Sequence, residues 1–147
     1  MRLKNKKAFT MIELVFVIVI IGVLSAIAIP KFGATAKLAY MSKGKNTLAI
    51  VRSALSTERQ KSILRGSFTP VTIYNASGRV FTRFTDENGS RILDNDLPSC
   101  IDIGCWSTSD NVNYTFYRDA STNCTYRLES NRFVDKTSSP GCTELEE

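Results

Sequence analysis

The residues of this chain form no recognisable catalytic constellation. Its 147 residues include no histidine, the commonest general base and metal ligand in proteins. The sequence also has no glycine-rich phosphate loop and no nucleophile motif with a partner base. The residue types therefore do not favour an enzyme, and no cofactor or metal is expected. The residues with distinctive chemistry are four cysteines and a glutamate that lies in an apolar segment.

The four cysteines all follow residue 99, and their spacing is not typical of a zinc site. Four residues separate Cys100 from Cys105, and seventeen separate Cys124 from Cys142. Four cysteines allow three disulfide pairings, of which local spacing favours Cys100–Cys105 and Cys124–Cys142. Disulfides indicate that this part of the chain lies in an oxidising compartment.

An acidic segment at residues 86–90, Asp-Glu-Asn-Gly-Ser, has three interpretations. The Asn-Gly pair with polar neighbours is typical of a turn, which is the interpretation we favour. Its carboxylates could instead join Asp94 and Asp96 as oxygen ligands of calcium. As a third interpretation, Asn88 begins an N-glycosylation sequon, with Asp86 as an upstream acid.

The glutamate, Glu13, lies near the start of a long apolar segment. The sixteen residues from Leu14 to Ile29 carry no charge, and the twenty-one residues from Phe9 to Ile29 carry only Glu13. As a helix, this segment would be about 31 Å long, close to the thickness of a bilayer core. The mean hydropathy of the whole chain, −0.09, excludes several such spans. A basic leader precedes the segment, with Arg2, Lys4, Lys6 and Lys7.

A cleaved secretory signal is the simplest explanation of such a segment. It would have a charged leader, an apolar region and the Ala-x-Ala pattern found at residues 26–28. Glu13 argues against this explanation, and against a plain membrane anchor, because a charge inside a membrane costs up to about 3 kcal/mol. The segment therefore calls for an interpretation in which Glu13 has a role.

The residues around Glu13 supply that interpretation. Residues 6–14, Lys-Lys-Ala-Phe-Thr-Met-Ile-Glu-Leu, are followed by the apolar run and by Ile-Pro-Lys-Phe at residues 29–32. This pattern resembles the N-terminus of type IV pilins and type II secretion pseudopilins. The match covers under a fifth of the chain, and it departs from the family in one residue, because Ala8 stands where the family usually has glycine.

The resemblance implies a sequence of processing and assembly. A prepilin peptidase would cut between Ala8 and Phe9 on the cytoplasmic side and N-methylate Phe9. The mature subunit would sit in the bacterial inner membrane, with its C-terminal domain in the periplasm. An inner-membrane assembly platform would then move it into a helical filament. There Glu13 would pair with the Phe9 amine of a staggered neighbour, and Pro30 would kink or loosen the helix.

Residues 31–65 are predicted to continue the helix and to end it near Arg65-Gly66. Leu48, Val51 and Leu55 form an apolar stripe that could lie on a sheet. The segment carries a net charge of +7, whereas residues 66–147 carry −5. Packing beside acidic neighbours in a filament accounts for this charge. Direct contact with DNA is the less favoured alternative, because no aromatic residues interleave with the cations in a way that would stack bases.

Residues 66–147 are rich in strand formers and turn residues, with a tight hairpin expected at Ser130-Asn131. The predicted fold class is α+β, pilin-like: a long helix packed on a small antiparallel sheet, with disulfides in the C-terminal region. The expected strands are Val71–Tyr74, Arg79–Phe84, Tyr114–Arg118, Cys124–Leu128 and Arg132–Val134.

The sequence as a whole predicts a pseudopilin-like structural subunit of a filament, used for type II secretion or for DNA uptake in natural transformation. One alternative is a type IV pilin for adhesion or twitching motility. Another is a membrane-anchored periplasmic binding module that does not polymerise. The expected organisation is a leader at 1–8, a membrane and assembly helix at 9–30, an amphipathic helix at 31–65 and a β-rich domain at 66–147.

Overall fold

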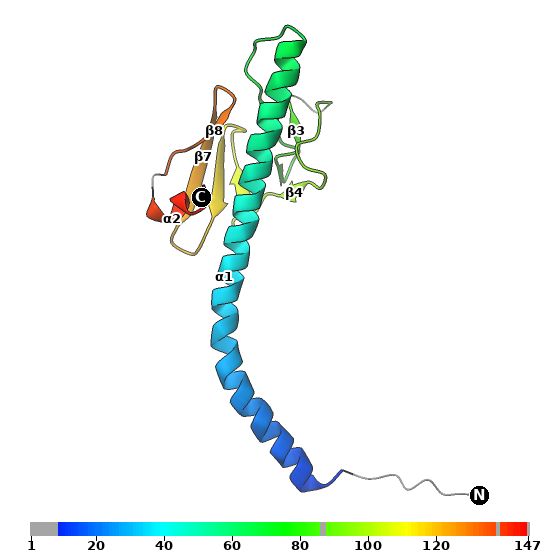
Figure 1. The fold of residues 1–147 in the computed structure, drawn as a ribbon, viewed down its shortest axis with the longest axis vertical. Helices are drawn as coiled ribbons and strands as arrows, with labels where there is room; N and C mark the ends of the chain where they lie inside the picture. Colours follow the sequence, from blue (N-terminus) through cyan, green and yellow to red (C-terminus); the bar gives the residue numbers. More distant parts are fainter. Residues whose placement is uncertain (1–8, 86–87, 138, 147) are drawn as a thin grey trace, which may run out of the picture. The chain divides into compact units, whose positions relative to one another are not determined.

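The computed structural model describes residues 9–85, 88–137 and 139–146. Within them a long helix is followed by short strands and a short C-terminal helix (Figure 1). The chain divides into two compact units between Lys37 and Leu38, and α1 contributes to both. The elements are α1 (Met11–Leu64), β1 (Ile73–Tyr74), β2 (Arg79–Val80), β3 (Arg83–Phe84), β4 (Leu97–Pro98), β5 (Trp106–Thr108), β6 (Asn113–Tyr117), β7 (Asn123–Glu129), β8 (Arg132–Asp135) and α2 (Pro140–Thr143).

The first unit contains a part of α1 whose apolar side chains are exposed. By length and composition, this part of the helix is able to cross a membrane. Pro30 lies inside α1, and the helix continues on both sides of it. Because proline has no N–H, the carbonyl of Ala26 has no intrahelical donor, and the helix is locally weaker there.

The end of α1 lies one residue before the predicted position. Gly66 has a positive φ of 77°, a conformation that favours glycine. Its N–H donates to the carbonyl of Ile63 at 2.9 Å, and the N–H of Ser67 donates to the carbonyl of Ser62 at 2.9 Å. This pair of hydrogen bonds is a Schellman motif, which satisfies carbonyls of the last turn.

In the second unit, α1 packs on a four-stranded antiparallel sheet with the strand order β5-β6-β7-β8 (Figure 1). The predicted stripe is confirmed, since Leu48, Val51 and Leu55 are each at most 1% exposed. Gly44 allows a close approach between helix and sheet, because a Cβ atom there would lie 2.5 Å from Cζ of Phe116. The class predicted from the sequence, α+β, is therefore confirmed.

Aromatic rings fill the centre of this unit. Tyr114 stacks on Phe81 with ring centroids 4.7 Å apart, and Tyr126 stacks on Phe133 at 5.7 Å. Trp106 contacts Phe81 edge-on at 5.3 Å. These rings come from β5, β6, β7, β8 and the segment between β2 and β3, so the aromatic core joins the main sheet to the smaller strands.

The prediction of one strand over Arg79–Phe84 is wrong. The structure divides it into β2, which pairs with β4, and β3, which pairs with β1. Between them Phe81 has a positive φ of 55°, and its N–H donates to Oδ1 of Asn75 at 2.6 Å. The break in the strand places the Phe81 ring in the aromatic core, where it is fully buried.

The disulfides are Cys100–Cys105 and Cys124–Cys142, the pairs that local spacing favours. The first closes a loop directly before β5, and the second ties β7 to α2. The two-residue hairpin between β7 and β8 is also where the sequence places it, with positive φ at both Ser130 and Asn131.

Candidate functional site

The predicted processing site lies at the edge of the described chain. Ala8 is outside the described residues, and Phe9 is the first residue inside them. The Phe9 side chain is 78% exposed. Cleavage between these residues and methylation of Phe9 remain predictions from the motif.

Glu13 is part of the N-terminal cap of α1. One of its oxygens, Oε2, accepts hydrogen bonds from the N–H of Thr10 at 2.9 Å and from the Thr10 hydroxyl at 2.8 Å. In return, Oγ1 of Thr10 accepts from the N–H of Glu13 at 3.3 Å. This reciprocal arrangement is a capping box, which satisfies donors that the first helical turn leaves free.

This role of Glu13 is not among the predictions made above from the sequence, although its signal is present there. A Thr-x-x-Glu pattern directly before an apolar run is the signature of a capping box. The other carboxylate oxygen of Glu13, Oε1, accepts no hydrogen bond from any residue in the described ranges. The carboxylate can therefore cap its own helix and still accept a hydrogen bond from a second group.

The apolar helix behind Glu13 has no protein cover within its own unit. Its large side chains are exposed, from Leu14 at 54% to Ile29 at 69% and Phe32 at 72%. Exposing so many adjacent apolar side chains to water is unfavourable, because each would gain free energy on burial. This surface is therefore suited to lipid or to other apolar helices.

In the second unit, the C-terminal segment is fastened at several points. Leu145 is 2% exposed. The guanidinium of Arg52 donates to the carbonyl of Phe133 at 3.0 Å and pairs with Glu146. Glu144 accepts from Arg118 at 2.7 Å. Together with the Cys124–Cys142 disulfide, these contacts hold the end of the chain against α1 and the sheet.

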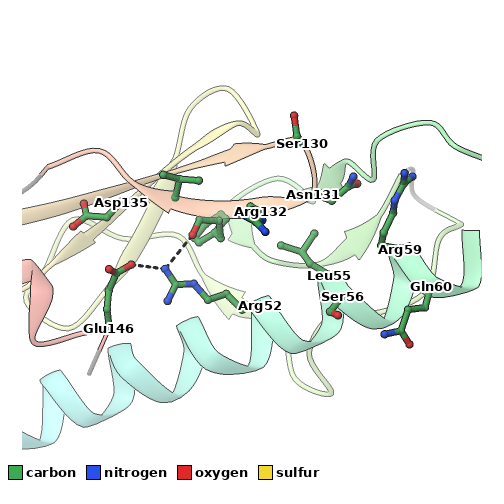
Figure 2. A pocket seen from close by; sticks show the side chains of 12 residues that line it. Arg52, Leu55, Ser56, Arg59, Gln60, Ser130, Asn131, Arg132, Asp135 and Glu146 are labelled. Carbon is green, nitrogen blue, oxygen red and sulfur yellow. Dashed lines mark hydrogen bonds and ion pairs between the residues drawn. The ribbon is translucent and has the colours of Figure 1, made fainter. Parts of the chain in front are cut away.

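An open groove of about 870 Å³ lies beside this segment, between α1 and the β7–β8 hairpin (Figure 2). Arg52 and Glu146 lie at the same end of it as Asp135, whereas Arg59 and Gln60 lie toward the other end. Among the described residues that line the groove, no hydrogen bond joins Ser56 or Ser130 to Asp135 or Glu146.

Two aspartates hold the connections of the main sheet. Oδ1 of Asp119 accepts from the N–H groups of Ser121 at 3.0 Å and Thr122 at 2.8 Å. These bonds stabilise the charged carboxylate and lower the pKa of Asp119 to about 2, and the bond from Ser121 has the largest effect. Asp110 accepts from the N–H groups of Asn113, the first residue of β6, and of Val112, and its pKa is lowered for the same reason.

The acidic segment at residues 86–90 is described only in part, since residues 86 and 87 lie outside the described ranges. Asn88 is exposed. The N–H of Phe84 donates to the carbonyl of Ser90 at 3.0 Å, a contact that fits the turn interpretation. Asp96, one of the proposed calcium ligands, pairs with Arg91 at 2.8 Å. Among the described residues, no group of three or more suitable side chains could hold a metal ion.

The chain is similar to known proteins at its N-terminus and also beyond it. Residues 3–29 match the family described as "Prokaryotic N-terminal methylation motif". The chain is 32% identical over 107 residues to a fimbrial protein of Pseudomonas aeruginosa, which covers 61% of this chain and 66% of that protein. It is 48% identical over 59 residues to the type IV narrow pilus major component PilA5 of Thermus thermophilus, covering 39% of this chain and 51% of PilA5.

No solved structure gives a significant match. The chain spans 66% of the length of the Pseudomonas relative and about half of PilA5. The methylation motif coincides with the capped start of α1 and the exposed apolar helix that follows it. With this motif at its start and pilus proteins among its relatives, the chain belongs to the type IV pilin family.

Proposed function

We propose that this chain is a structural subunit that is cut between Ala8 and Phe9 by a prepilin peptidase and then polymerises into a filament based in the bacterial inner membrane. The single observation that carries the proposal is the exposed apolar surface of α1 from its capped start to Ile29, a range in which Glu13 is the one charge. Lipid can cover such a surface but offers Glu13 no partner. A bundle of copies of the chain can cover the surface and also supply a partner for Glu13.

The organisation of the chain follows from this proposal. Residues 1–8 are the leader, and residues 9–30 span the inner membrane before assembly and line the filament core after it. Residues 31–65 continue the helix, and residues 66–147 complete the domain on the periplasmic or outer side. An inner-membrane assembly platform is the partner that would move the subunit from lipid into the filament.

Glu13 has two roles in this proposal. Oε2 caps its own helix through Thr10, and Oε1 is left to accept from the Phe9 amine of a neighbouring subunit. That amine is a cation at neutral pH once the leader has been removed. In an apolar surrounding an unpaired charge is costly, so the axial stagger that pairs both charges is favoured over others.

Three variants of the full-length chain test this assignment. Glu13→Val removes both roles, and Glu13→Gln keeps a hydrogen-bond acceptor for the cap but removes the charge. Thr10→Val removes the hydroxyl of the cap and keeps the charge. Both Glu13 variants should insert into the membrane and be cleaved, yet yield no filaments, whereas Thr10→Val should still assemble. Normal filaments from Glu13→Gln would contradict the charge pairing.

The kind of filament is a second question. Type II secretion or DNA uptake is the use that the sequence analysis favours. The relatives named as a fimbrial protein and a pilus major component favour a surface pilus, used for adhesion or twitching motility. Immunogold labelling of intact cells separates them, because a surface pilus extends beyond the outer surface and a pseudopilus does not. Loss of secretion, of transformation or of twitching in a deletion strain then identifies the machine.

A membrane-anchored binding module that never polymerises is the remaining alternative. It would occur in cells as a membrane protein without sheared filaments, and Glu13→Val would leave its activity unchanged. DNA contact by the cationic part of α1 is not included in this proposal, because no aromatic residues interleave with its lysines and arginines in a way that would stack bases.

A further inference from the structure

The loop closed by the Cys100–Cys105 disulfide exposes apolar side chains. Ile101 is 76% exposed and Ile103 is 44% exposed, and the exposed Asp102 lies between them. Among the described residues, no group donates a hydrogen bond to the Asp102 side chain or forms an ion pair with it. The tip of this loop, residues 101–103, therefore presents one free carboxylate between two isoleucines.

The loop is held firmly in this position. The N–H of Cys100 donates to the carbonyl of Trp106 at 3.1 Å, and the N–H of Gly104 donates to that of Tyr117 at 2.7 Å. Gly104 has a φ of +83°, and a Cβ atom there would lie 2.4 Å from Cδ1 of Tyr40. A disulfide, two hydrogen bonds and a glycine packed against an α1 side chain thus fix a loop whose two isoleucines contact solvent.

A complementary surface lies on α1. Leu38, Ser42, Lys45 and Ala49 are spaced by four, three and four residues, so they share one face of the helix. All of them are exposed, Leu38 at 71%. We name these residues the lysine face. No acidic residue occurs between residues 14 and 57, so Lys45 has no carboxylate near it on the helix.

The loop of one copy cannot reach its own lysine face. It packs on Tyr40, and residues two apart on an α-helix point about 200° apart. Leu38 and Ser42 each lie two residues from Tyr40, so the lysine face is on the opposite side of α1 from the loop. Any contact between the loop and the lysine face is therefore a contact between two copies of the chain.

We infer that the 101–103 loop tip of one copy docks on the lysine face of a second copy. Asp102 pairs with Lys45, and the isoleucines cover Leu38 and the methylene groups of Lys45. Each copy offers the loop on one side of α1 and the lysine face on the other. Such a head-to-tail interface repeats from copy to copy and produces open polymers or rings rather than closed dimers. The inference rests on the proposed function and names one of the contacts between subunits.

Charge exchange in the full-length chain tests the contact. Asp102→Lys and Lys45→Glu should each reduce sheared filaments by about tenfold or more, because each places like charges opposite one another. The double variant restores the pair and should return filaments to near the wild-type amount. Asp94→Lys and Lys43→Glu are matched controls, since both residues are exposed and lie outside the loop and the lysine face. Both controls should assemble normally.

A photo-crosslinking amino acid at position 101 gives a second measurement. In a mixture of isotopically light and heavy chains, it should link one copy to a peptide from residues 38–49 of another. Links only to other segments or to lipid, or normal filaments from Asp102→Lys, would overturn the loop contact and leave the proposed function standing. An absence of filaments from the wild-type chain would overturn both. Intact disulfides and normal Trp106 fluorescence in each variant establish that the chain has folded.

Discussion

Residues 9–37 and residues 38–146 use apolar side chains in opposite ways. In the first unit, the large apolar side chains of α1 are exposed around the helix. In the second, α1 has an apolar stripe at Leu48, Val51 and Leu55, and the side chains of that stripe are buried against a sheet. The two units differ both in the amount of apolar residues on α1 and in their pattern. A helix that is apolar all round needs cover from lipid or other helices, whereas a striped helix is covered by its own domain.

The largest effect expected from a change in the second unit is loss of the Cys124–Cys142 disulfide. The bond joins residues 18 apart in sequence and ties the C-terminal segment to β7. Replacing both cysteines with serine should lower the free energy of unfolding by about 3 kcal/mol, through the entropy of the unfolded chain. Denaturant titration of the full chain in detergent, followed by fluorescence of Trp106, the single tryptophan, measures the change.

The other disulfide is the comparison for this experiment. Cys100–Cys105 joins residues only 5 apart, so the same change there should cost about 2 kcal/mol. An equal or larger loss at Cys100 and Cys105 would contradict the loop-length argument. An unchanged unfolding midpoint for either pair would contradict the disulfide itself.

Two glycines of α1 test the comparison between the units directly. At Gly44 a Cβ atom would lie 2.5 to 2.9 Å from ring atoms of Phe116, which is fully buried, whereas at Gly33 nothing lies within 4 Å. Gly44→Ala should destabilise the chain by about 1 to 3 kcal/mol through overpacking. Gly33→Ala should be neutral, or stabilise the helix by up to about 1 kcal/mol. Thermal unfolding of both variants in the same detergent provides the measurement. Equal effects would contradict the claim that α1 is packed against a sheet at Gly44 and is uncovered at Gly33.

Much of this difference between the units could be predicted from the sequence. The apolar run, the stripe on α1 and the Ser130-Asn131 hairpin depend on residues close together in the chain, whose types and spacing are visible directly. The Thr10–Glu13 cap is equally local and was predictable from its Thr-x-x-Glu pattern. The left-handed Phe81 was not predictable, because it depends on Asn75 and on aromatic rings from distant strands. The same is true of Arg52 and Glu146, which lie 94 residues apart.

A smaller effect is expected where the C-terminal segment meets α1. Arg52 and Glu146 are each about a third exposed, so solvent weakens their attraction. Arg52→Ala also removes the hydrogen bond to the Phe133 carbonyl, and should cost about 1 kcal/mol in the free energy of unfolding. Lys136→Ala, which removes an exposed pair with Glu129, is the control and should cost less than about 0.5 kcal/mol. Similar losses in the two variants would show that Arg52 is no more than a surface charge.

The smallest expected effect is a dependence on pH in the second unit. The pKa of Asp119 is about 2 in the folded chain, below its value near 4 in an unfolded chain. The stability that its carboxylate contributes is therefore complete above about pH 4 and is lost as the pH falls through about 2. Asp119→Asn lacks this titration. The difference in unfolding free energy between wild type and variant should shrink between about pH 4 and 2, and a constant difference would contradict the assignment.

The central claim is that residues 9–37 are covered in a filament by copies of the same chain after cleavage at Ala8–Phe9. The most direct test is the intact mass of the protein recovered from filaments sheared from cells that express the full chain. The predicted result is a polymer of chains that begin with N-methylated Phe9 and keep both disulfides. A chain that begins at Ile29, or one found only as an unprocessed membrane protein that begins at Met1, would contradict the claim.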